Sequence, residues 1–270
     1  VVKKPPQQNT HVYLNYATYP AWWNIGDKRF EIYTHYLSDN GNINEVYNQS
    51  IYPALKRINM NNNEIILEIG EDENFYEIGS SEPFTGNASY AWPNGNKYVG
   101  EFRNGDYCGQ GTLFFGNGNK YVGQFEQDAF NGNGTLYWSN SDRYEGQFVD
   151  DMFNGNGIIY WSNGDKYDGE FKDDKMNGKG LKIWANGDTY EGEFKNDRIN
   201  GTGIFTWTDG EKYDGNFKNG EFHGKGIKTW TNGDKYVGEF KDGNLHGKGT
   251  YYFANGEKFV GKFRNGEYKG

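Results

Sequence analysis

Hydrophobic and polar residues alternate in short bursts along most of this chain. The clearest burst, Tyr98–Phe102, reads aromatic, variable, glycine, polar, aromatic, and the same pattern starts again every 23 residues. Period-2 alternation is typical of a β-strand with one buried face. A fixed period of roughly 20–50 residues indicates an array in which each unit packs on its neighbours. The pattern occupies Tyr98–Phe102, Tyr121–Phe125, Tyr144–Phe148, Tyr167–Phe171, Tyr190–Phe194, Tyr213–Phe217, Tyr236–Phe240 and Phe259–Phe263.

Each unit is predicted to contain two strands. In the unit that begins at Tyr121, we expect a strand over Tyr121–Phe125, a glycine-rich loop over Gln127–Gly134 and a second strand over Thr135–Trp138. Most units then return through Asn-Gly, which between two strands predicts a type I′ turn with positive φ at both residues. The prediction for residues 84–270 is therefore mainly β: an elongated single-layer antiparallel β-meander of about eight hairpin repeats.

Glycine lies between the Tyr and the Phe of each first strand, on the aromatic face of the predicted sheet. A strand glycine leaves a gap that a neighbouring ring can cover. We expect the aromatic residue at the end of each second strand to supply that ring. These residues are Phe115, Trp138, Trp161, Trp184, Trp207, Trp230 and Phe253. The opposite face, rich in Lys, Glu, Asp and Gln, is expected to face solvent.

Residues 1–83 have no such period and are predicted to form a small α+β piece. Apolar spacing favours a helix over Ile43–Ile58, and Pro53 within it predicts a kink or a helix start near Ser50–Tyr52. Strands are predicted over His11–Tyr16, Lys28–Leu37, Glu64–Ile69 and Phe75–Ile78. This region is expected to cap the first edge strand of the array or to hold a second partner.

Composition narrows the functional classes. The chain has 18% aromatic residues and 40 glycines, which argues for a folded sheet despite only 34% hydrophobic residues. A net charge of −9 disfavours nucleic acid and anionic membranes, which bind concentrated basic faces. The single Cys108 excludes an internal disulfide. The sequence shows no signal-peptide pattern and no apolar run of membrane-spanning length, and Val1 indicates a processed or partial chain.

The repeating unit resembles the MORN repeat (membrane occupation and recognition nexus) over about residues 84–270, best in Tyr236–Lys258. MORN arrays accompany junctophilins at membrane contacts, plant phosphatidylinositol phosphate kinases, a SET-domain lysine methyltransferase, ciliary radial-spoke proteins and protist cytoskeletal scaffolds. The resemblance implies a scaffolding or accessory module and not a catalyst. It also implies a cytoplasmic protein, in a cytoskeletal, ciliary or membrane-associated setting.

No catalytic residue, metal or cofactor is expected. His223, His246 and Cys108 occupy equivalent positions, but a metal needs three or four converging ligands and the intervening units carry Asn there. The G-x-G of each loop lacks the helix of a phosphate-binding loop. Acidic pairs such as Asp150-Asp151 lack calcium-loop spacing. The carboxylates of the polar face are spread along the array, so no pair suggests a glycosidase.

The aromatic face is the candidate binding surface, because half-covered rings invite a partner and Tyr and Trp dominate binding energies. A partner helix or extended peptide is predicted on an aromatic groove formed by Tyr121, Phe125, Trp138, Tyr144, Phe148, Trp161, Tyr167, Phe171, Trp184, Tyr190, Phe194, Trp207, Tyr213 and Trp230.

Three other readings stay open. A recurring lysine strip could bind phosphoinositide headgroups, although the negative charge of the array disfavours it; it consists of Lys172, Lys195, Lys218 and Lys241. Homodimerisation through the terminal edge strand Phe259–Phe263 is plausible. The chain could also be a regulatory fragment of an enzyme whose catalytic domain lies outside these residues.

Overall fold

The computed structural model describes residues 11–12, 21–25, 28–32, 65 and 67–269. The chain divides into two compact units, residues 1–108 (unit 1) and 109–270 (unit 2). The described residues form strands and turns and contain no helix. None of their segments is therefore a helix long and apolar enough to cross a membrane. The helix predicted over Ile43–Ile58 lies outside the described residues.

Unit 1 contains short strands followed by the first hairpin of the array. One sheet has the order β1-β3-β2, and a separate hairpin pairs β4 with β5, within the strands predicted over Glu64–Ile69 and Phe75–Ile78. β6 pairs antiparallel with β7. The bounds are β1 (His11–Val12), β2 (Ala21–Ile25), β3 (Lys28–Ile32), β4 (Leu67–Ile69), β5 (Phe75–Glu77), β6 (Gly86–Ala91) and β7 (Lys97–Arg103).

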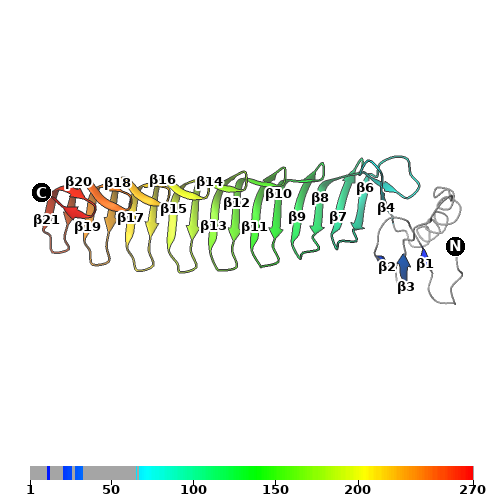
Figure 1. The fold of residues 1–270 in the computed structure, drawn as a ribbon, viewed down its shortest axis with the longest axis horizontal. Helices are drawn as coiled ribbons and strands as arrows, with labels where there is room; N and C mark the ends of the chain where they lie inside the picture. The colour runs from blue at the N-terminus through cyan, green and yellow to red at the C-terminus, as the bar shows by residue number, and fades with distance from the viewer. Residues whose placement is uncertain (1–10, 13–20, 26–27, 33–64, 66, 270) are drawn as a thin grey trace, which may run out of the picture. The chain divides into compact units, whose positions relative to one another are not determined.

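Unit 2 is a long antiparallel meander in which strands of seven and nine residues alternate (Figure 1). From β9 to β22, each strand pairs antiparallel with the next one in the chain. The predicted hairpin array is confirmed. The bounds are β8 (Asp106–Phe114), β9 (Lys120–Glu126), β10 (Ala129–Tyr137), β11 (Arg143–Val149), β12 (Met152–Tyr160), β13 (Lys166–Lys172), β14 (Lys175–Ile183), β15 (Thr189–Lys195), β16 (Arg198–Thr206), β17 (Lys212–Lys218), β18 (Glu221–Thr229), β19 (Lys235–Lys241), β20 (Asn244–Tyr252), β21 (Lys258–Arg264) and β22 (Glu267–Tyr268).

A ladder of glycines crosses the strands of unit 2. The register places Gly123 opposite Gly134, and Gly134 opposite Gly146, and the same pairing recurs in the following repeats. The ring of Tyr121 lies over this ladder, so that a Cβ added to Gly123 or Gly134 would overlap with it. The prediction that the second-strand aromatics cover the glycines is wrong. The Tyr two residues earlier on the same strand face covers them instead.

The connection predicted as a loop over Gln127–Gly134 is also different. A two-residue turn is enough there, and β10 starts at Ala129 with a register shift between Phe130 and Gly134. The strand brings Phe130 onto Tyr121, and the two rings stack with centroids 3.7 Å apart. The loop prediction was wrong because a bulge hides the strand's alternation.

The two kinds of turn are exchanged relative to the prediction. Positive φ at both central residues, the mark of a type I′ turn, occurs at Gln127 and Asp128. At the Asn-Gly connection of the preceding hairpin only Gly118 has positive φ. There Asn117 accepts a hydrogen bond from the Asn119 amide through its side chain (3.0 Å), so it shapes a longer turn instead of entering a type I′ turn.

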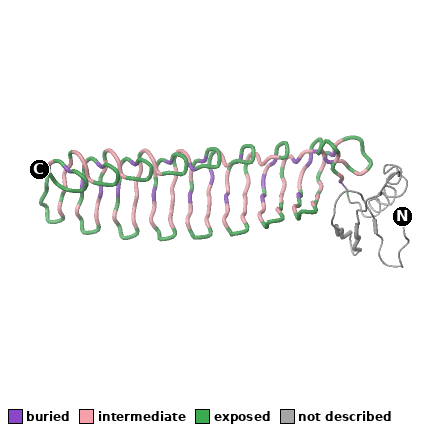
Figure 2. Tube along the Cα trace, in the orientation of Figure 1, coloured by how far each residue is buried: buried purple, intermediate pink, exposed green. Residues whose placement is uncertain are grey.

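Burial follows one face of the meander, and buried residues recur at the same place in successive hairpins (Figure 2). The first-strand tyrosines from Tyr98 to Tyr236 are completely buried, and the Phe four residues after each of them is nearly so. A single-layer sheet thus builds a core from its own side chains. Ring stacking, edge-to-face contacts and glycine gaps make this possible.

Candidate functional site

One face of the sheet in unit 2 carries a buried set of rings, which we call the inner layer, and half-buried tryptophans that directly follow the nine-residue strands. The inner layer is represented by Tyr121, which contacts Phe125 at 5.1 Å and Phe148 of the next repeat at 5.0 Å between centroids. Its hydroxyl donates a hydrogen bond of 2.9 Å to the carbonyl of Gln124. Burial raises the pKa of this phenol well above its usual value. This layer is the core of the sheet.

Nine residues of the predicted groove belong to this inner layer and are buried. The inner nine are Tyr121, Phe125, Tyr144, Phe148, Tyr167, Phe171, Tyr190, Phe194 and Tyr213. The remaining five are half-buried tryptophans, each placed at the start of an Asn-Gly or equivalent turn. They are Trp138, Trp161, Trp184, Trp207 and Trp230. We call these five residues the tryptophan row.

A second set of apolar residues lies beside the tryptophan row. Trp138 contacts Phe153 edge-to-face at 6.0 Å, and Trp207 contacts Phe222 in the same way at 5.9 Å. Sequence reasoning missed Phe153 and Phe222 because it assigned their segments to loops. The signal that could have revealed them is an apolar residue recurring at the same position of each unit: Phe130, Phe153, Met176, Ile199, Phe222 and Leu245.

Two lysines enter the tryptophan row. The Lys182 ammonium lies 4.6 Å from the Trp161 ring centroid and 5.6 Å from that of Trp184. Lys228 occupies the equivalent place two repeats later, 3.4 Å from the ring centroid of Trp207, and is only 7% exposed. Lys228 forms an ion pair with Glu211, whereas Lys182 forms none with the described residues of unit 2. Within the described part of the chain, Lys182 is therefore a cation of the row that no carboxylate neutralises.

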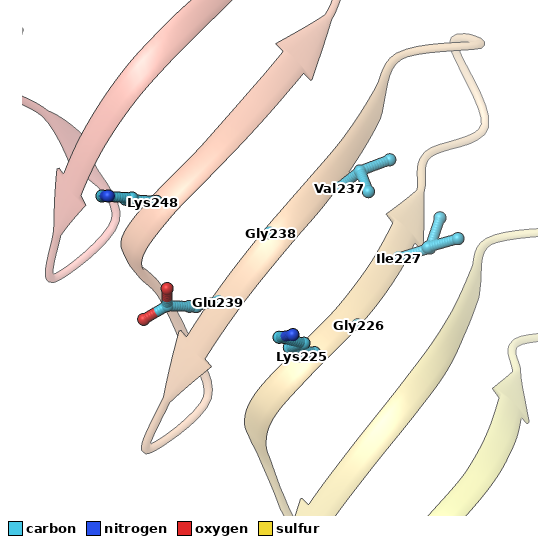
Figure 3. Close-up of a pocket in the computed structure, with 7 residues that line it drawn as sticks. All are labelled: Lys225, Gly226, Ile227, Val237, Gly238, Glu239 and Lys248. Carbon is cyan, nitrogen blue, oxygen red and sulfur yellow. The ribbon is translucent and has the colours of Figure 1, made fainter.

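The opposite face is less polar than expected. Ile227 and Val237 pair across β18 and β19 and are exposed, and the Lys120 ammonium lies 4.3 Å from the Tyr137 ring centroid. A shallow depression of about 330 Å³ lies on this face. Figure 3 shows that Lys225, Glu239 and Lys248, which line it, come from three successive strands. Its charged groups stand beside aliphatic side chains.

The lysine strip lies on the face opposite the tyrosines, and all four of its residues are exposed. Lys172 is directly opposite Lys175, and Lys195 is opposite Arg198. The later cross-strand partners of the strip are Glu221 and Asn244. The strip is thus basic in its first half only, and its binding of lipid headgroups stays a prediction.

The acidic and histidine residues that were considered as catalytic groups or metal ligands have structural contacts instead. The carboxylate of Glu170 accepts a hydrogen bond of 2.9 Å from the amide of Lys179 at the bulge. Asp150 and Asp151 form a type I′ turn, with φ values of 48° and 66°. His223 has Asp242 as its neighbour, with 3.7 Å between Nδ1 and Oδ1. In the part of the chain that the structure describes, no three His, Cys, Asp or Glu side chains gather as a metal site would require.

Carboxylates also clamp successive repeats together. Asp151 Oδ1 accepts a hydrogen bond of 2.7 Å from the Phe130 amide, and Asp142 Oδ1 accepts one of 2.7 Å from the Ser162 amide. The Ser162 amide, as the main cause, lowers the pKa of Asp142. Because such bonds recur along both edges of the sheet, the spacing of the tryptophan row is held by polar contacts on either side of it.

One comparison, with protein-family models, identifies the repeat. A family model described as the MORN repeat matches seven consecutive segments over residues 98–258, more than half of the chain. No curated protein matches the sequence. The SAS-4 TCP domain of Drosophila melanogaster, solved in complex with a proline-rich motif of Ana2, is 13% identical, with a TM-score of 0.36 and coverage of 68% of this chain and 94% of that one. The G-box domain of the microcephaly protein CPAP is 12% identical, with a TM-score of 0.37 and coverage of 66% and 100%.

Proposed function

We propose, since the chain belongs to the MORN repeat family, that it is a non-enzymatic scaffold whose tryptophan row binds a segment of a partner protein. Repeat arrays of this kind are protein-interaction modules. Their regular side chains offer an extended surface that a globular pocket does not. Here that surface is the tryptophan row of unit 2.

The observation that carries the proposal is a periodic row of half-buried indoles on a fully packed base. The rings of the inner layer are satisfied by their own sheet, as the complete burial of Tyr144, Tyr167 and Tyr190 shows. Trp161 and Trp184 are only partly covered, by Lys182 over both rings and by Phe205 at 5.2 Å from Trp184, and both stay partly open to solvent. Large amphipathic rings that are rigid but incompletely covered are the residues that most often dominate a protein interface.

The remaining polar groups support a scaffold more than a catalyst. Acid–base chemistry needs carboxylates or imidazoles that can reach a substrate. In unit 2, the carboxylates of Asp142, Asp174 and Glu170 are engaged by backbone amides. Their work in the molecule is to join strands and repeats.

The test is quantitative co-purification from the source organism with the full chain as bait. The double variant Trp161→Ala/Trp184→Ala is expected to lose the partner while its β circular dichroism spectrum is retained. The matched control is Ile227→Ala/Val237→Ala, which removes two exposed aliphatic side chains from the opposite face. A partner that the tryptophan variant keeps and the control loses would place the binding surface on the opposite face and refute the proposal.

A further inference from the structure

We infer that the tryptophan row recognises a proline-rich segment in the polyproline II conformation, running across the strands with one turn of the segment per repeat. The inference rests on the proposed function and names the conformation and chemistry of the partner. It is carried by the pitch of the row, by the indole donors and by the charge of Lys182.

The pitch of the row is set by the hairpins. Every repeat contributes two strands, and neighbouring strands lie about 4.8 Å apart, so successive tryptophans follow one another at about 9.6 Å. A polyproline II helix has three residues per turn and a rise of about 3.1 Å, so the same side of the helix recurs at about 9.3 Å. The mismatch is about 0.3 Å per repeat, and it adds up to about 1.2 Å over the four intervals between Trp138 and Trp230.

Other conformations fit less well. Side chains seven residues apart on an α-helix lie about 10.5 Å apart, which gives a mismatch of about 3.6 Å over the same four intervals. A β-strand repeats its face at about 6.7 Å and falls out of step within one repeat. Proline-rich segments also bind aromatic-lined grooves with a small loss of entropy, because the polyproline II conformation is formed beforehand.

The indole N–H groups give a second, independent argument. The side chains of the five tryptophans donate no hydrogen bond to any described residue, and none of these donors is among the buried polar atoms without a partner. They are therefore available to a ligand. A polyproline II segment has no internal hydrogen bonds and presents its carbonyls outward, whereas the carbonyls inside an α-helix are already bonded. A row of indole N–H donors, spaced like the turns of a polyproline II helix, therefore suits a polyproline II segment better than an α-helix.

The positive charge of Lys182 predicts an acidic residue at one position of the bound segment. Lys182 stands between Trp161 and Trp184, and no carboxylate of the described residues pairs with it. The equivalent Lys228 is already neutralised by Glu211. The segment should therefore carry an acidic residue between the two turns that contact Trp161 and Trp184, and none is needed at Lys228. Apart from this position, prolines spaced by three residues are the expected pattern.

The experiment measures fluorescence anisotropy of labelled peptides with the full-length chain. The proline probe has 15 residues, with proline at two of every three positions and one central Glu, and is about 46 Å long in the polyproline II conformation. The comparison probe is an alanine-rich helical peptide of the same length with the same Glu. We expect saturable binding of the proline probe, and at least about tenfold weaker binding by Trp161→Ala/Trp184→Ala. Ile227→Ala/Val237→Ala should bind like the unaltered protein.

Two more conservative variants separate the contribution of the indole N–H group from that of the Lys182 charge, and both are expected to leave the fold intact. Trp184→Phe keeps a ring and removes its N–H donor, and is expected to weaken the proline probe several-fold. Lys182→Glu should reverse the charge preference, so that a probe with a central Lys binds better than the one with Glu. Unchanged preference in Lys182→Glu would overturn the charge assignment.

The outcomes also separate this inference from the proposed function. If the helical probe binds as tightly as the proline probe and depends on Trp161 and Trp184, the polyproline II assignment is overturned and the scaffold proposal stands. If neither probe shows tryptophan-dependent binding, the assignment is overturned as well. The scaffold proposal is then judged by the partner co-purification alone.

Discussion

The middle of the array and its last described repeat differ in how their first rings are buried. Tyr190 is completely buried, in contact with Phe194 of its own repeat at 5.2 Å and Phe217 of the next at 5.0 Å. Phe259 occupies the same position in the last repeat and is 50% exposed. No described repeat follows it, and its ring neighbours are Phe253 and Tyr268. Complete burial of each first-strand ring therefore requires the following repeat in addition to its own.

The residue at the second position of the type I′ turns also differs between the middle and the later repeats. In the middle repeats the second residue of the type I′ turn is Asp, and its carboxylate binds the preceding repeat, as Asp174 Oδ1 does with the Phe153 amide at 2.8 Å. In the later repeats glycine takes this place, and Gly243 keeps only the backbone bond to the Phe222 carbonyl, at 3.1 Å. The middle repeats are thus held by more contacts between neighbours. Stability in a repeat array is largely a sum of such neighbour terms, so it should vary along the chain.

The largest expected difference concerns the rings themselves. Tyr190→Ala removes a fully buried ring and is expected to lower the free energy of unfolding by about 3–5 kcal/mol. Phe259→Ala, at the half-exposed end, should lower it by less than about 1 kcal/mol. Urea unfolding followed by circular dichroism measures both. Similar losses for the two variants would mean that burial does not depend on the following repeat.

The buried tyrosines should make the array sensitive to alkali. Burial raises the pKa of Tyr236 from an ordinary value of 10.0 to about 12, and it raises that of Tyr190 as well. A group with a raised pKa in the folded state stabilises the fold fully below its unfolded pKa. That stability is lost as the pH rises from about 10 through the folded pKa.

We therefore expect the free energy of unfolding to fall above pH 10, and phenolate absorbance at 295 nm to appear together with unfolding. Tyr190→Phe should reduce the steepness of this fall by the contribution of one proton. Phenolate that appears near pH 10 in a protein that is still folded would contradict the burial of the inner layer.

The turn carboxylates should have a smaller effect. Asp174→Ala removes the bond to the Phe153 amide and places Ala at a φ of 65°, for an expected loss of about 1–2 kcal/mol. Asp174→Gly loses the same bond without the strain and should recover about 1 kcal/mol of that loss. Thermal unfolding gives the energies, and faster hydrogen exchange at the Phe153 amide locates the change. An amide whose protection is unaltered would show that the clamp is absent in solution.

The smallest expected effect is a loss of stability at low pH. Backbone amides of Ser162 and Ala254 lower the pKa values of Asp142 and Asp234 below the ordinary 3.8. Stability from a depressed pKa is present above the unfolded value and is lost as the pH falls through the folded one. Unfolding should therefore become slightly easier below about pH 4, and Asp142→Asn should flatten that dependence. Both carboxylates are solvent-accessible, so screening keeps the effect small.

Sequence alone determined the period, the two strands per repeat and the side of the sheet on which the first-strand residues lie. These follow from the period-2 geometry of a strand, which places Tyr121 and Phe125 on one face whatever surrounds them. It also drew attention to the aromatic side as the candidate surface. It could not tell which of those rings form the core and which remain available.

Tertiary structure decided the division between Tyr121, which is core, and Trp138, which is half-buried. That division depends on the cross-strand register that aligns Gly123 with Gly134 and on the bulge that brings Phe130 onto the Tyr121 ring. Register and ring stacking join residues from different strands, so they are absent from any local pattern. For the same reason the type I′ turns lie at the acidic pairs and not at Asn-Gly: the strands that each turn must join, and not the dipeptide alone, set its backbone angles.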